Sequence, residues 1–357
     1  MEKLGIPSPL FWRDKRVLVT GHTGFKGTWL MNWLDELGAI TAGLSYSGYP
    51  KTILGNVDMQ LDLDIDADIR SDDWQEKISN FQPQIIFHLA AQSLVYTGIV
   101  DPRYTFETNV IGSVHILELM NTITSIVTVV IITTDKVYQI GSGGSPRTEE
   151  DPLGGLDPYS ASKSAVELIA KAWPIGIGQS LITARSGNVI GGGDAAKKRL
   201  LPDLIRAWNS GEEMNLRSPM GIRPWLHVLE PLRGYLLLAE LGFSPSLSRQ
   251  SFNFAPSANN HVTVKEIAQR VFVTLPLKQG FEIHEQSTIE FLETKELMLS
   301  ANKAKTQLYW SPVWGWEKAV DITVNWYQKF YQGVDPTTLY KADLNLYIND
   351  LESERHA

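Results

Sequence analysis

A glycine-rich turn restricts the fold of this chain more than any other stretch. It follows Arg16–Thr20, a short apolar run rich in β-branched residues that we expect to form a buried strand. Gly21, Gly24 and Gly27 lie in the turn, and residues 28–37 then have a helical pattern. Glycines in this context permit a tight turn and the close approach of a pyrophosphate, which lies at the N-terminus of the helix. The order therefore predicts dinucleotide binding, and the alternative is a plain turn between a strand and a helix.

Strands and helices alternate along the chain from residue 16 to residue 133. We expect strands at 40–46, 85–89 and 127–133, helices at 72–80 and 101–120, a helix that begins at Tyr159, and a further strand at 181–185. Such alternation predicts a parallel, doubly wound sheet. Residues 141–157 are rich in Gly, Ser, Pro and Glu and are expected to form an active-site loop. The charged tail after Asp343 is expected to be peripheral.

Charge and composition exclude several classes of function. The net charge is −8, from 40 acidic and 32 basic residues, which argues against a broad nucleic-acid surface but allows a local basic pocket for phosphates. The absence of cysteine excludes disulfides, thiolate metal sites and cysteine nucleophiles. The first residues lack the apolar core of a signal peptide, and the longest aliphatic runs are too short to span a bilayer. We therefore expect a cytoplasmic enzyme with no metal, no nucleic-acid partner and no membrane partner.

Tyr159 and Lys163 lie four residues apart, so they share one face of the expected helix. A free phenol has a pKa of roughly 10, too high for a base at neutral pH, and a neighbouring ammonium lowers that pKa. A shift of about three units requires roughly 4 kcal/mol. One cation ~4 Å away supplies about that much at an effective dielectric of ~20. The pair thus suits a base that removes a hydroxyl proton during hydride transfer, although the spacing alone is more often that of an ordinary amphipathic helix.

The ends of the other expected strands differ in what they offer a ligand. Ala90, Ala91 and Gln92 follow the strand at 85–89, at the edge where open α/β sheets bind ligands, and the small alanines allow a cofactor to come close. No carboxylate follows the strand at 40–46 to hold an adenosine ribose, which leaves the choice between NAD and NADP open. Lys51 in that tail either accepts a 2′-phosphate or caps a loop. Lys26 in the glycine turn either adds charge near the phosphates or points into solvent.

Together these features resemble the extended short-chain dehydrogenase/reductase superfamily. The motifs that carry the resemblance are Gly21-x-x-Gly24-x-x-Gly27, Asp68-Ile69, His88-Leu89-Ala90-Ala91, Asn109 and Tyr159-x-x-x-Lys163. Over about residues 12–325 the chain resembles one branch, the CDP-glucose 4,6-dehydratases. The spans that match this branch are 19–27, 87–92, 134–136, 154–160, 187–194 and 223–232. His-Thr-Gly-Phe-Lys-Gly in the turn and Gly-Gly-Gly-Asp at 191–194 are specific within the superfamily.

This resemblance implies an internal redox reaction on a nucleotide-activated hexose, with NAD as cofactor and a role in deoxysugar biosynthesis. Tyr159 would take the proton of the C4 hydroxyl as hydride passes from C4 to NAD⁺. Lys163 would hold the cofactor ribose and lower the pKa of Tyr159, and Thr134 would hydrogen-bond the C4 oxygen. The resulting 4-keto group acidifies the C5 proton, water is lost across C5 and C6, and hydride returns to C6. The product implied is a 4-keto-6-deoxy sugar.

The adjacent pair Asp135 and Lys136 is implied to carry out the loss of water. Asp135 would protonate the departing C6 hydroxyl as general acid, and Lys136 would be the C5 base, where TDP-glucose dehydratases carry Glu. A lysine is a base only when neutral, and desolvation beside another cation such as Lys163 would favour that form. The alternative is a Lys136 that only orients Asp135 through a salt bridge.

The resemblance also implies fold, domains, partners and contact residues. It implies a Rossmann-type doubly wound parallel sheet with a smaller mixed α/β C-terminal substrate lobe, and a homodimer through helices 101–120 and 159–173. Residues 1–190 would form the NAD-binding domain, to which segments near 222–256 return, and 191–357 the nucleotide-sugar lobe. Expected cofactor contacts are Gly21, Thr23, Gly24, Phe25, Lys26, Gly27, Asp68, Ile69, Leu89, Ala90, Ala91, Gln92, Asn109, Tyr159, Lys163 and Ser186. Expected substrate contacts are Gln92, Thr134, Asn188, Arg199, Leu201, Arg217, Arg223 and His227.

Two departures from the branch leave its details open. Residues 141–147 are glycine-rich where the CDP-glucose enzymes carry aromatic residues, which leaves the nucleotide and the hexose open. Residues 46–56 lack the usual pattern near the cofactor. A nucleotide-sugar 4-epimerase is the nearest alternative, but it needs no acid–base pair for losing water, so Asp135 and Lys136 favour a dehydratase. A non-catalytic dinucleotide sensor should lack the tyrosine base that this chain retains.

Overall fold

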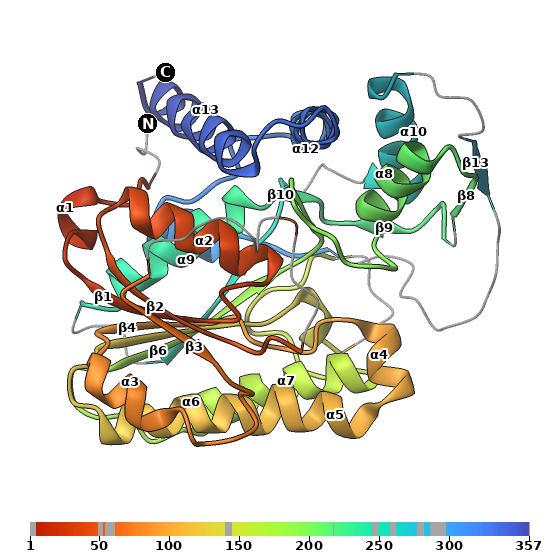
Figure 1. Ribbon diagram of the computed structural model, residues 1–357. Helices are drawn as coiled ribbons and strands as arrows, with labels where there is room; N and C mark the ends of the chain where they lie inside the picture. The colour runs from red at the N-terminus through yellow and green to blue at the C-terminus, as the bar shows by residue number, and fades with distance from the viewer. Residues whose placement is uncertain are drawn as a thin grey trace.

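A parallel β-sheet forms the centre of the molecule. The structure is a computed structural model that describes residues 5–48, 53, 61–139, 145–216, 218–244, 249–257, 262–276, 282–285 and 298–356. The sheet has seven strands in the order β11-β6-β5-β4-β1-β2-β3, and every pairing within it is parallel (Figure 1). The strands are β1 Arg16–Thr20, β2 Ile40–Ser45, β3 Leu63–Asp66, β4 Ile85–His88, β5 Thr128–Ile132, β6 Ser180–Ser186 and β11 Arg249–Phe254. The predicted doubly wound sheet is confirmed.

Helices cover both faces of the sheet, which explains why β5 reads as a continuous apolar run, buried at every position. One face carries α1 Pro9–Trp12, α2 Phe25–Glu36 and α9 Leu229–Leu241 (Figure 1). The other carries α3 Gln75–Phe81, α4 Val95–Val100, α5 Pro102–Phe106, α6 Gly112–Thr122 and α7 Pro158–Ala172. A separate apolar cluster fills each face, with Trp29 and Leu232 in one and Ile116 and Val166 in the other. The helix expected at 101–120 is α5 and α6, joined by a π-helical turn at Glu107–Ile111.

The direction in which the chain adds strands reverses between β1 and β4. The sheet grows through β2 and β3 to one side and through β4, β5 and β6 to the other. In open sheets, ligands bind beyond the carboxyl ends of the strands at such a reversal. The chain later returns to add β11 beside β6, in the register Arg249↔Leu181 to Phe254↔Ser186. The boundary between two domains at residue 190 stays a prediction.

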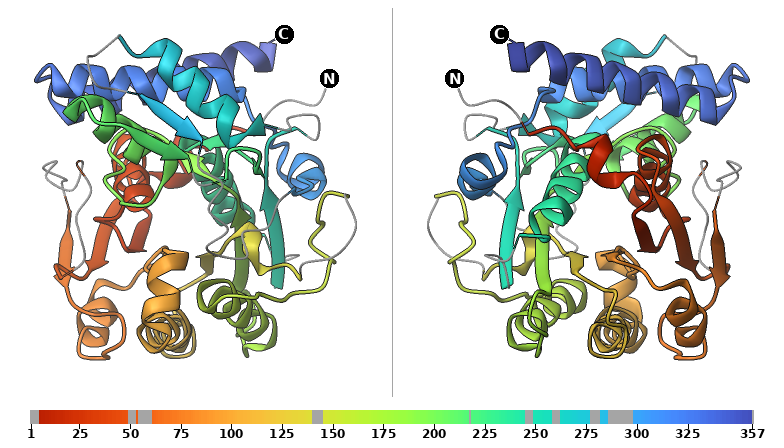
Figure 2. Two further views of the ribbon diagram at one scale, coloured as in Figure 1. Left: turned by 90° about the vertical axis from the view of Figure 1, so that its right-hand side faces the viewer. Right: turned by 90° about the vertical axis from the view of Figure 1, so that its left-hand side faces the viewer.

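Most of the remaining described elements lie beyond the carboxyl ends of the strands or above α2, and one helix, Asn302–Leu308, packs against β11 and α9 (Figure 2). They include three small strand pairs, β7 with β10, β9 with β12, and β8 with β13. Their bounds are β7 Val189–Ile190, β8 Met214–Leu216, β9 Ile222–Arg223, β10 Leu226–His227, β12 Val262–Thr263 and β13 Ile283–Glu285. The helices are α8 Leu200–Ser210, α10 Val264–Thr274, α11 Asn302–Leu308, α12 Trp316–Tyr331 and α13 Pro336–His356. In the part of the chain that the structure describes, no helix is long and apolar enough to cross a membrane.

The C-terminal helix α13 corrects one expectation. The tail after Asp343 is not peripheral, because Leu344, Tyr347 and Leu351 are buried in the main core. The Tyr347 hydroxyl donates to Glu230 Oε2 on α9 at 2.6 Å. The spacing of the three apolar residues places them on one helical face, which the frequent charges between them obscured.

Candidate active site

The carboxyl ends of β1, β4, β5 and β6 carry most of the residues expected to act on a ligand. The glycine turn follows β1, and its backbone is crowded where side chains would stand. Gly21 has φ +71°, and a Cβ there would lie 2.8 Å from the Ala90 nitrogen. A Cβ on Gly27 would overlap the Gly21 carbonyl oxygen. Helix α2 begins at Phe25 with no side-chain cap at Gly24, so its first N–H groups are free of a capping side chain. This turn fits a dinucleotide pyrophosphate.

The expected adenosine end of the site is supplied from β3 as well as β2. The His22 ring lies against Gly43, with Nδ1 3.0 Å from Ser45 Oγ and Nε2 3.2 Å from an Asp64 carboxylate oxygen. Asp66 of β3 accepts a hydrogen bond from the Ser47 backbone at 2.8 Å. Two carboxylates of the neighbouring strand, Asp64 and Asp66, thus lie near the end of β2, which has none of its own. The alternation of Asp62, Asp64 and Asp66 was the sequence signal for this strand. Lys51 lies outside the described residues.

Asp68 and Ile69 lie beyond β3. The Asp68 carboxylate accepts hydrogen bonds from Arg70, at 3.0 Å from Nε, 2.6 Å from Nη2 and 2.9 Å from the backbone N–H, and these bonds hold the pKa of Asp68 below its ordinary value. Ile69 is buried against Gly112. Asp68 is thus fixed in place with part of its carboxylate exposed.

Gln92 and Asn109 hold the loop after β4. Gln92 Nε2 donates to Leu94 O and Thr105 Oγ1, and its Oε1 accepts from the Leu94 backbone at 2.6 Å. Asn109 donates to Gln92 O at 3.1 Å and to Ser162 Oγ at 2.8 Å, and accepts from Gln92 N at 2.8 Å. Both N–H groups of the Gln92 amide and one lone pair of its oxygen have partners within the protein, and its expected contacts with cofactor and substrate stay predictions. These two residues position β4 against α7. The backbone N–H groups of Leu89 and Ala90 donate to Thr20 of β1, and Ala91 follows them in the same loop.

Asp135 is a buried carboxylate with one oxygen held and one open. Thr134 Oγ1 donates to its Oδ1 at 3.0 Å, and Lys136 Nζ lies 3.5 Å from the same atom. Its Oδ2 is buried and has no hydrogen-bond partner among the described residues. A buried carboxylate oxygen without a partner is costly, so this atom is a candidate for a ligand contact. The Lys136 side chain is 29% exposed, and its contact with Asp135 matches the orienting alternative.

Tyr159 and Lys163 share the first two turns of α7, which Asp157 caps by accepting from the Ser160 backbone at 3.0 Å. Burial raises the pKa of Tyr159 to about 12, and the hydrogen bond with Thr134 and the charge of Arg199 only partly offset it. Lys163 Nζ instead donates to the Ile132 carbonyl at 3.0 Å. The expected lowering of the tyrosine pKa by Lys163 is therefore corrected. Burial and the charge of Lys26 lower the pKa of Lys163 itself to about 8.

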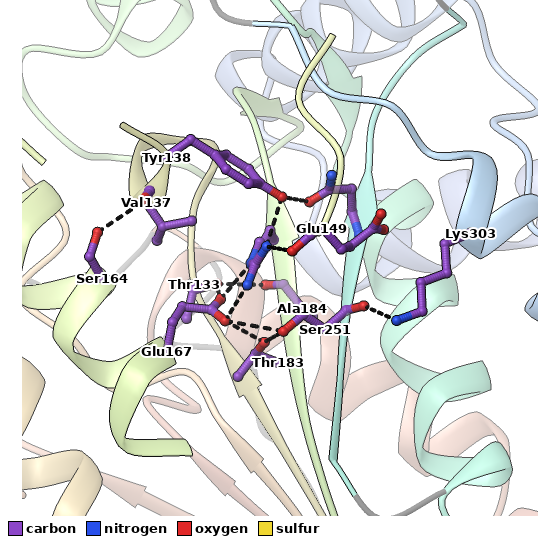
Figure 3. A network of polar contacts seen from close by, with 12 residues as sticks. Thr133, Val137, Tyr138, Glu149, Ser164, Glu167, Thr183, Ala184, Ser251 and Lys303 are labelled. Carbon is purple, nitrogen blue, oxygen red and sulfur yellow. Dashed lines mark hydrogen bonds and ion pairs between the residues drawn. The ribbon is translucent and has the colours of Figure 1, made fainter. Parts of the chain in front are cut away.

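One turn beyond Lys163, Glu167 anchors α7 to the sheet, which sequence reasoning missed (Figure 3). Its carboxylate accepts from Arg185 Nε at 2.9 Å and Nη2 at 2.8 Å, a paired geometry that is strong for a carboxylate. It also accepts from Thr133 Oγ1 at 2.5 Å and Thr183 Oγ1 at 2.7 Å. Arg185 continues the network to the Tyr138 hydroxyl at 2.8 Å. Thr133 directly precedes Thr134, so the Glu167 network fixes the segment that carries Asp135.

Lys26 is partly buried, and its ammonium is held inside the protein rather than pointing into solvent. Its Nζ donates to Ser186 Oγ at 2.9 Å and to the Tyr235 hydroxyl at 3.2 Å. Phe25 beside it is buried, and the Thr23 backbone donates to Ser45 Oγ at 3.2 Å.

The expected substrate residues divide into two groups. Arg199 bonds Asp194 at 3.1 Å and Ser93 at 3.2 Å, and its charge acts on both Tyr159 and Lys26, so it lies near the reacting centre. The expected substrate contact of His227 is corrected, because the residue is fully buried. Its ring centroid lies 4.8 Å from that of Trp314 and 6.0 Å from that of Trp29. Burial lowers its pKa to about 3, and it is a core residue.

Three further expected contacts have structural partners, and one cannot be placed. Leu201 is packed in the main core. The Asn188 carbonyl accepts from the Leu226 backbone at 3.0 Å, and Arg223 Nη1 donates to the Ile222 carbonyl at 2.9 Å. Arg217 lies outside the described residues.

Comparison with known proteins agrees with this arrangement. Residues 17–248 match the NAD dependent epimerase/dehydratase family. The chain belongs to this family. It is 36% identical over 352 residues to a CDP-glucose 4,6-dehydratase of Salmonella typhimurium strain LT2, an alignment that covers 95% of this chain and 98% of that protein. The predicted resemblance to the extended short-chain dehydrogenase/reductases and to their CDP-glucose branch is confirmed.

Solved structures of the family share the fold. A UDP-glucose 4-epimerase of Thermotoga maritima has a TM-score of 0.78 at 21% identity, and covers 88% of this chain and 99% of its own. A dTDP-glucose 4,6-dehydratase of Streptomyces venezuelae, with NAD bound, has a TM-score of 0.76 at 24% identity, with coverages of 90% and 99%. Epimerases and dehydratases of the family are thus equally similar in fold, so the site must distinguish them.

Proposed function

We propose that this protein is an NAD-dependent dehydratase that converts a nucleoside-diphosphate hexose, CDP-glucose in the first instance, to its 4-keto-6-deoxy derivative. The observation that carries the proposal is the buried, unpartnered Oδ2 of Asp135 beside Thr134 and Tyr159. An epimerase needs only the tyrosine base at C4, whereas a dehydratase also needs an acid for the leaving hydroxyl. The 36% identical Salmonella relative, named a CDP-glucose 4,6-dehydratase, supports the choice of nucleotide.

Tyr159 and Thr134 act on the C4 hydroxyl. Their mutual hydrogen bond brings both oxygens together, which supports the proposal that they receive one sugar hydroxyl and that Tyr159 takes its proton. NAD⁺ held against the glycine turn would supply the hydride chemistry between C4 and C6, and its ring charge would favour the phenolate. Lys163, held on the Ile132 carbonyl, carries donors for the cofactor ribose.

Asp135 and Lys136 act on C5 and C6. The open Oδ2, when protonated, gives its proton to the C6 oxygen, which leaves as water while the C5–C6 double bond forms. Lys136 takes the C5 proton in its neutral form, so the sugar loses one hydrogen from C5 and one hydroxyl from C6. In its charged form, Lys136 holds Asp135 Oδ1, so one side chain serves both as the orienting group and as the base.

The finer assignments rest on the placement of the remaining residues. Arg199 beside Tyr159 is proposed to meet the diphosphate, and Asn188 and Arg223 to line the nucleotide end. Residues 1–190 with β11 are proposed as the NAD-binding domain and the rest as the nucleotide-sugar lobe.

Exposed Phe106, Ile111 and Leu168 on the outer helices support a homodimer through α5, α6 and α7. We propose that the protein works in the cytoplasm.

Incubation with NAD⁺ and a panel of CDP-, TDP-, UDP- and GDP-hexoses tests this function by the mass of each product. We expect CDP-glucose to lose one water. A product of unchanged mass but altered configuration would show that the protein is an epimerase. If only another nucleotide sugar lost water, the proposed reaction would stand and the proposed substrate, CDP-glucose, would be wrong.

A further inference from the structure

Tyr138 directly follows the single 3₁₀ turn Asp135–Val137, which carries the two groups proposed to remove water. Tyr138 is buried, and its hydroxyl bonds two side chains of the sheet (Figure 3). Arg185 Nη1 of β6 donates to this hydroxyl at 2.8 Å, and the hydroxyl lies 2.6 Å from Asn253 Oδ1 of β11. Because a guanidinium can only donate, the Tyr138 hydroxyl accepts from Arg185 and gives its own proton to Asn253.

Arg185 and Asn253 both reach the hydroxyl because they are neighbours across two strands. They pair directly in the register of β6 and β11, so their side chains leave the same face of the sheet. Thr183 and Ser251 form the next pair on this face, and their hydroxyl oxygens are 2.8 Å apart. A row of polar side chains therefore stands where apolar ones would pack against a helix. Such a buried row is costly unless its members are satisfied, and it then holds one geometry.

The same row holds both ends of the turn. Before the turn, Thr133 Oγ1 donates to Glu167 at 2.5 Å. After the turn, Tyr138 accepts from Arg185, the ion-pair partner of Glu167. Between these two anchors, Asp135 Oδ2 is buried without a partner among the described residues. A fixed backbone with one open carboxylate oxygen is the arrangement expected of a preorganised acid.

We propose that Tyr138 is a positioning residue of the water-elimination step, whose hydroxyl keeps the turn Asp135–Val137 where its side chains act on C5 and C6. This inference rests on the proposed dehydratase function. Tyr138 itself forms no bond to the substrate and exchanges no proton with it. Oxidation at C4 depends less on this anchor, because its proposed base, Tyr159, lies on α7. A displacement of about 1 Å in a catalytic group costs up to about a hundredfold in rate, so a loosened turn should act mainly on the loss of water.

Two variants test the hydroxyl and its acceptor separately. Tyr138→Phe keeps the ring and removes both hydrogen bonds, whereas Asn253→Ala leaves the phenol in place and removes its acceptor. Product formation from CDP-glucose and NAD⁺ is measured beside the near-ultraviolet absorbance of reduced nicotinamide, which reports oxidation at C4. Tyr138→Phe should slow product formation about tenfold, with the rate of C4 oxidation, KM and the dinucleotide Kd within about threefold. Reduced nicotinamide should therefore accumulate.

Asn253→Ala carries the same test independently of Tyr138→Phe. It should show the same accumulation to a smaller extent, because Arg185 still holds the hydroxyl. The double variant should form product at a rate within about twofold of Tyr138→Phe, since both changes break the same hydrogen bond. The matched control is Tyr347→Phe, which also removes a buried hydroxyl, the donor to Glu230 of α9. It should lose stability in thermal unfolding without accumulating reduced nicotinamide.

Equal slowing of C4 oxidation and of water loss in Tyr138→Phe would show a general structural role and overturn the proposal. Unchanged product formation in this variant would overturn it as well, as would equal accumulation of reduced nicotinamide in Tyr347→Phe. Effects that multiply in full in the double variant would show that Tyr138 and Asn253 act separately, against the proposed anchor. A wild-type protein that removes no water from any nucleotide sugar would instead overturn the proposed function itself.

Discussion

At the scale of single residues, the proposed reacting groups could be named from the sequence, whereas their electrostatic surroundings could not. Tyr159, Lys163 and Asp135 stand out by spacing and motif. The pKa of Tyr159 depends on its complete burial and on Thr134 and Arg199, which come from distant parts of the chain. Lys26 was visible in the glycine turn, but only the fold brings it to Ser186 and Tyr235.

Tyr159→Phe is expected to abolish turnover, because no other hydroxyl in the site is set to take the C4 proton. The dinucleotide should still bind with an affinity within about threefold of the wild type, since the ring keeps its packing. Steady-state rates and equilibrium dialysis with NAD⁺ check this. Near-normal turnover in the variant would exclude Tyr159 as the base.

Asp135→Asn should slow the loss of water more than the oxidation at C4, because an amide is a far weaker acid than a carboxyl group. Reduced nicotinamide should then accumulate, and its near-ultraviolet absorbance reports it. Rates of product formation should fall about a hundredfold or more. Full product formation with no such absorbance would contradict the general-acid role.

Lys26→Met should make the folded protein more stable, on the order of a few kcal/mol. The pKa of Lys26 falls from 10.5 to about 7 on folding, so the unfolded chain binds more protons between these values. The gain should therefore be largest below about pH 7 and should shrink as pH rises toward 10.5. Thermal unfolding across this pH range measures it, and a gain that is independent of pH would show that burial of charge is not the cause.

At the scale of elements, strands covered on both faces were predicted well and strands at the edges were missed. β1, β4, β5 and β6 are apolar runs of β-branched residues, which are visible in the sequence. β3 and β11 are half-polar, because each lies at an edge of the sheet. The contact of α7 with β6 through Glu167 and Arg185 also escaped sequence reasoning, since a lone Arg on a strand resembles a surface residue.

Glu167→Gln is expected to destabilise the protein by about 3 kcal/mol, because it leaves the Arg185 guanidinium buried without its carboxylate. Activity should fall as well, since Thr133 loses the acceptor that fixes the segment of Asp135. Chemical unfolding and kcat are the measurements. The exposed Glu118→Gln on α6 is the matched control and should change neither. Equal stability of the two variants would refute the anchoring role.

At the scale of the whole molecule, the sheet and the family were predictable from local patterns, whereas the packing of the C-terminal segment was not. α13 buries Tyr347 against Glu230 of α9, although it is more than a hundred residues distant along the chain. Charged residues on its outer face concealed the buried stripe. Asp350 on the same helix accepts a hydrogen bond from Trp314 Nε1 to its Oδ2 at 2.7 Å.

Tyr347→Ala should therefore lower the free energy of unfolding by about 3 to 5 kcal/mol, because it opens a cavity and leaves Glu230 without its hydroxyl donor. Lys341→Ala on the exposed face of α13 is the control and should change stability by less than about 0.5 kcal/mol. Urea unfolding distinguishes them. A Tyr347→Ala variant as stable as the control would show that the segment after Asp343 is peripheral and contradict its role in the core.

The central claim is that one hydrogen moves within the sugar from C4 to C6 while water leaves. The most direct measurement uses CDP-glucose with deuterium at C4, incubated with the protein and NAD⁺, followed by mass and NMR analysis of the product. The account predicts a product that has lost one water and carries the deuterium in its C6 methyl group. A product of unchanged mass with the deuterium still at C4, or a dehydrated product without deuterium, would contradict it.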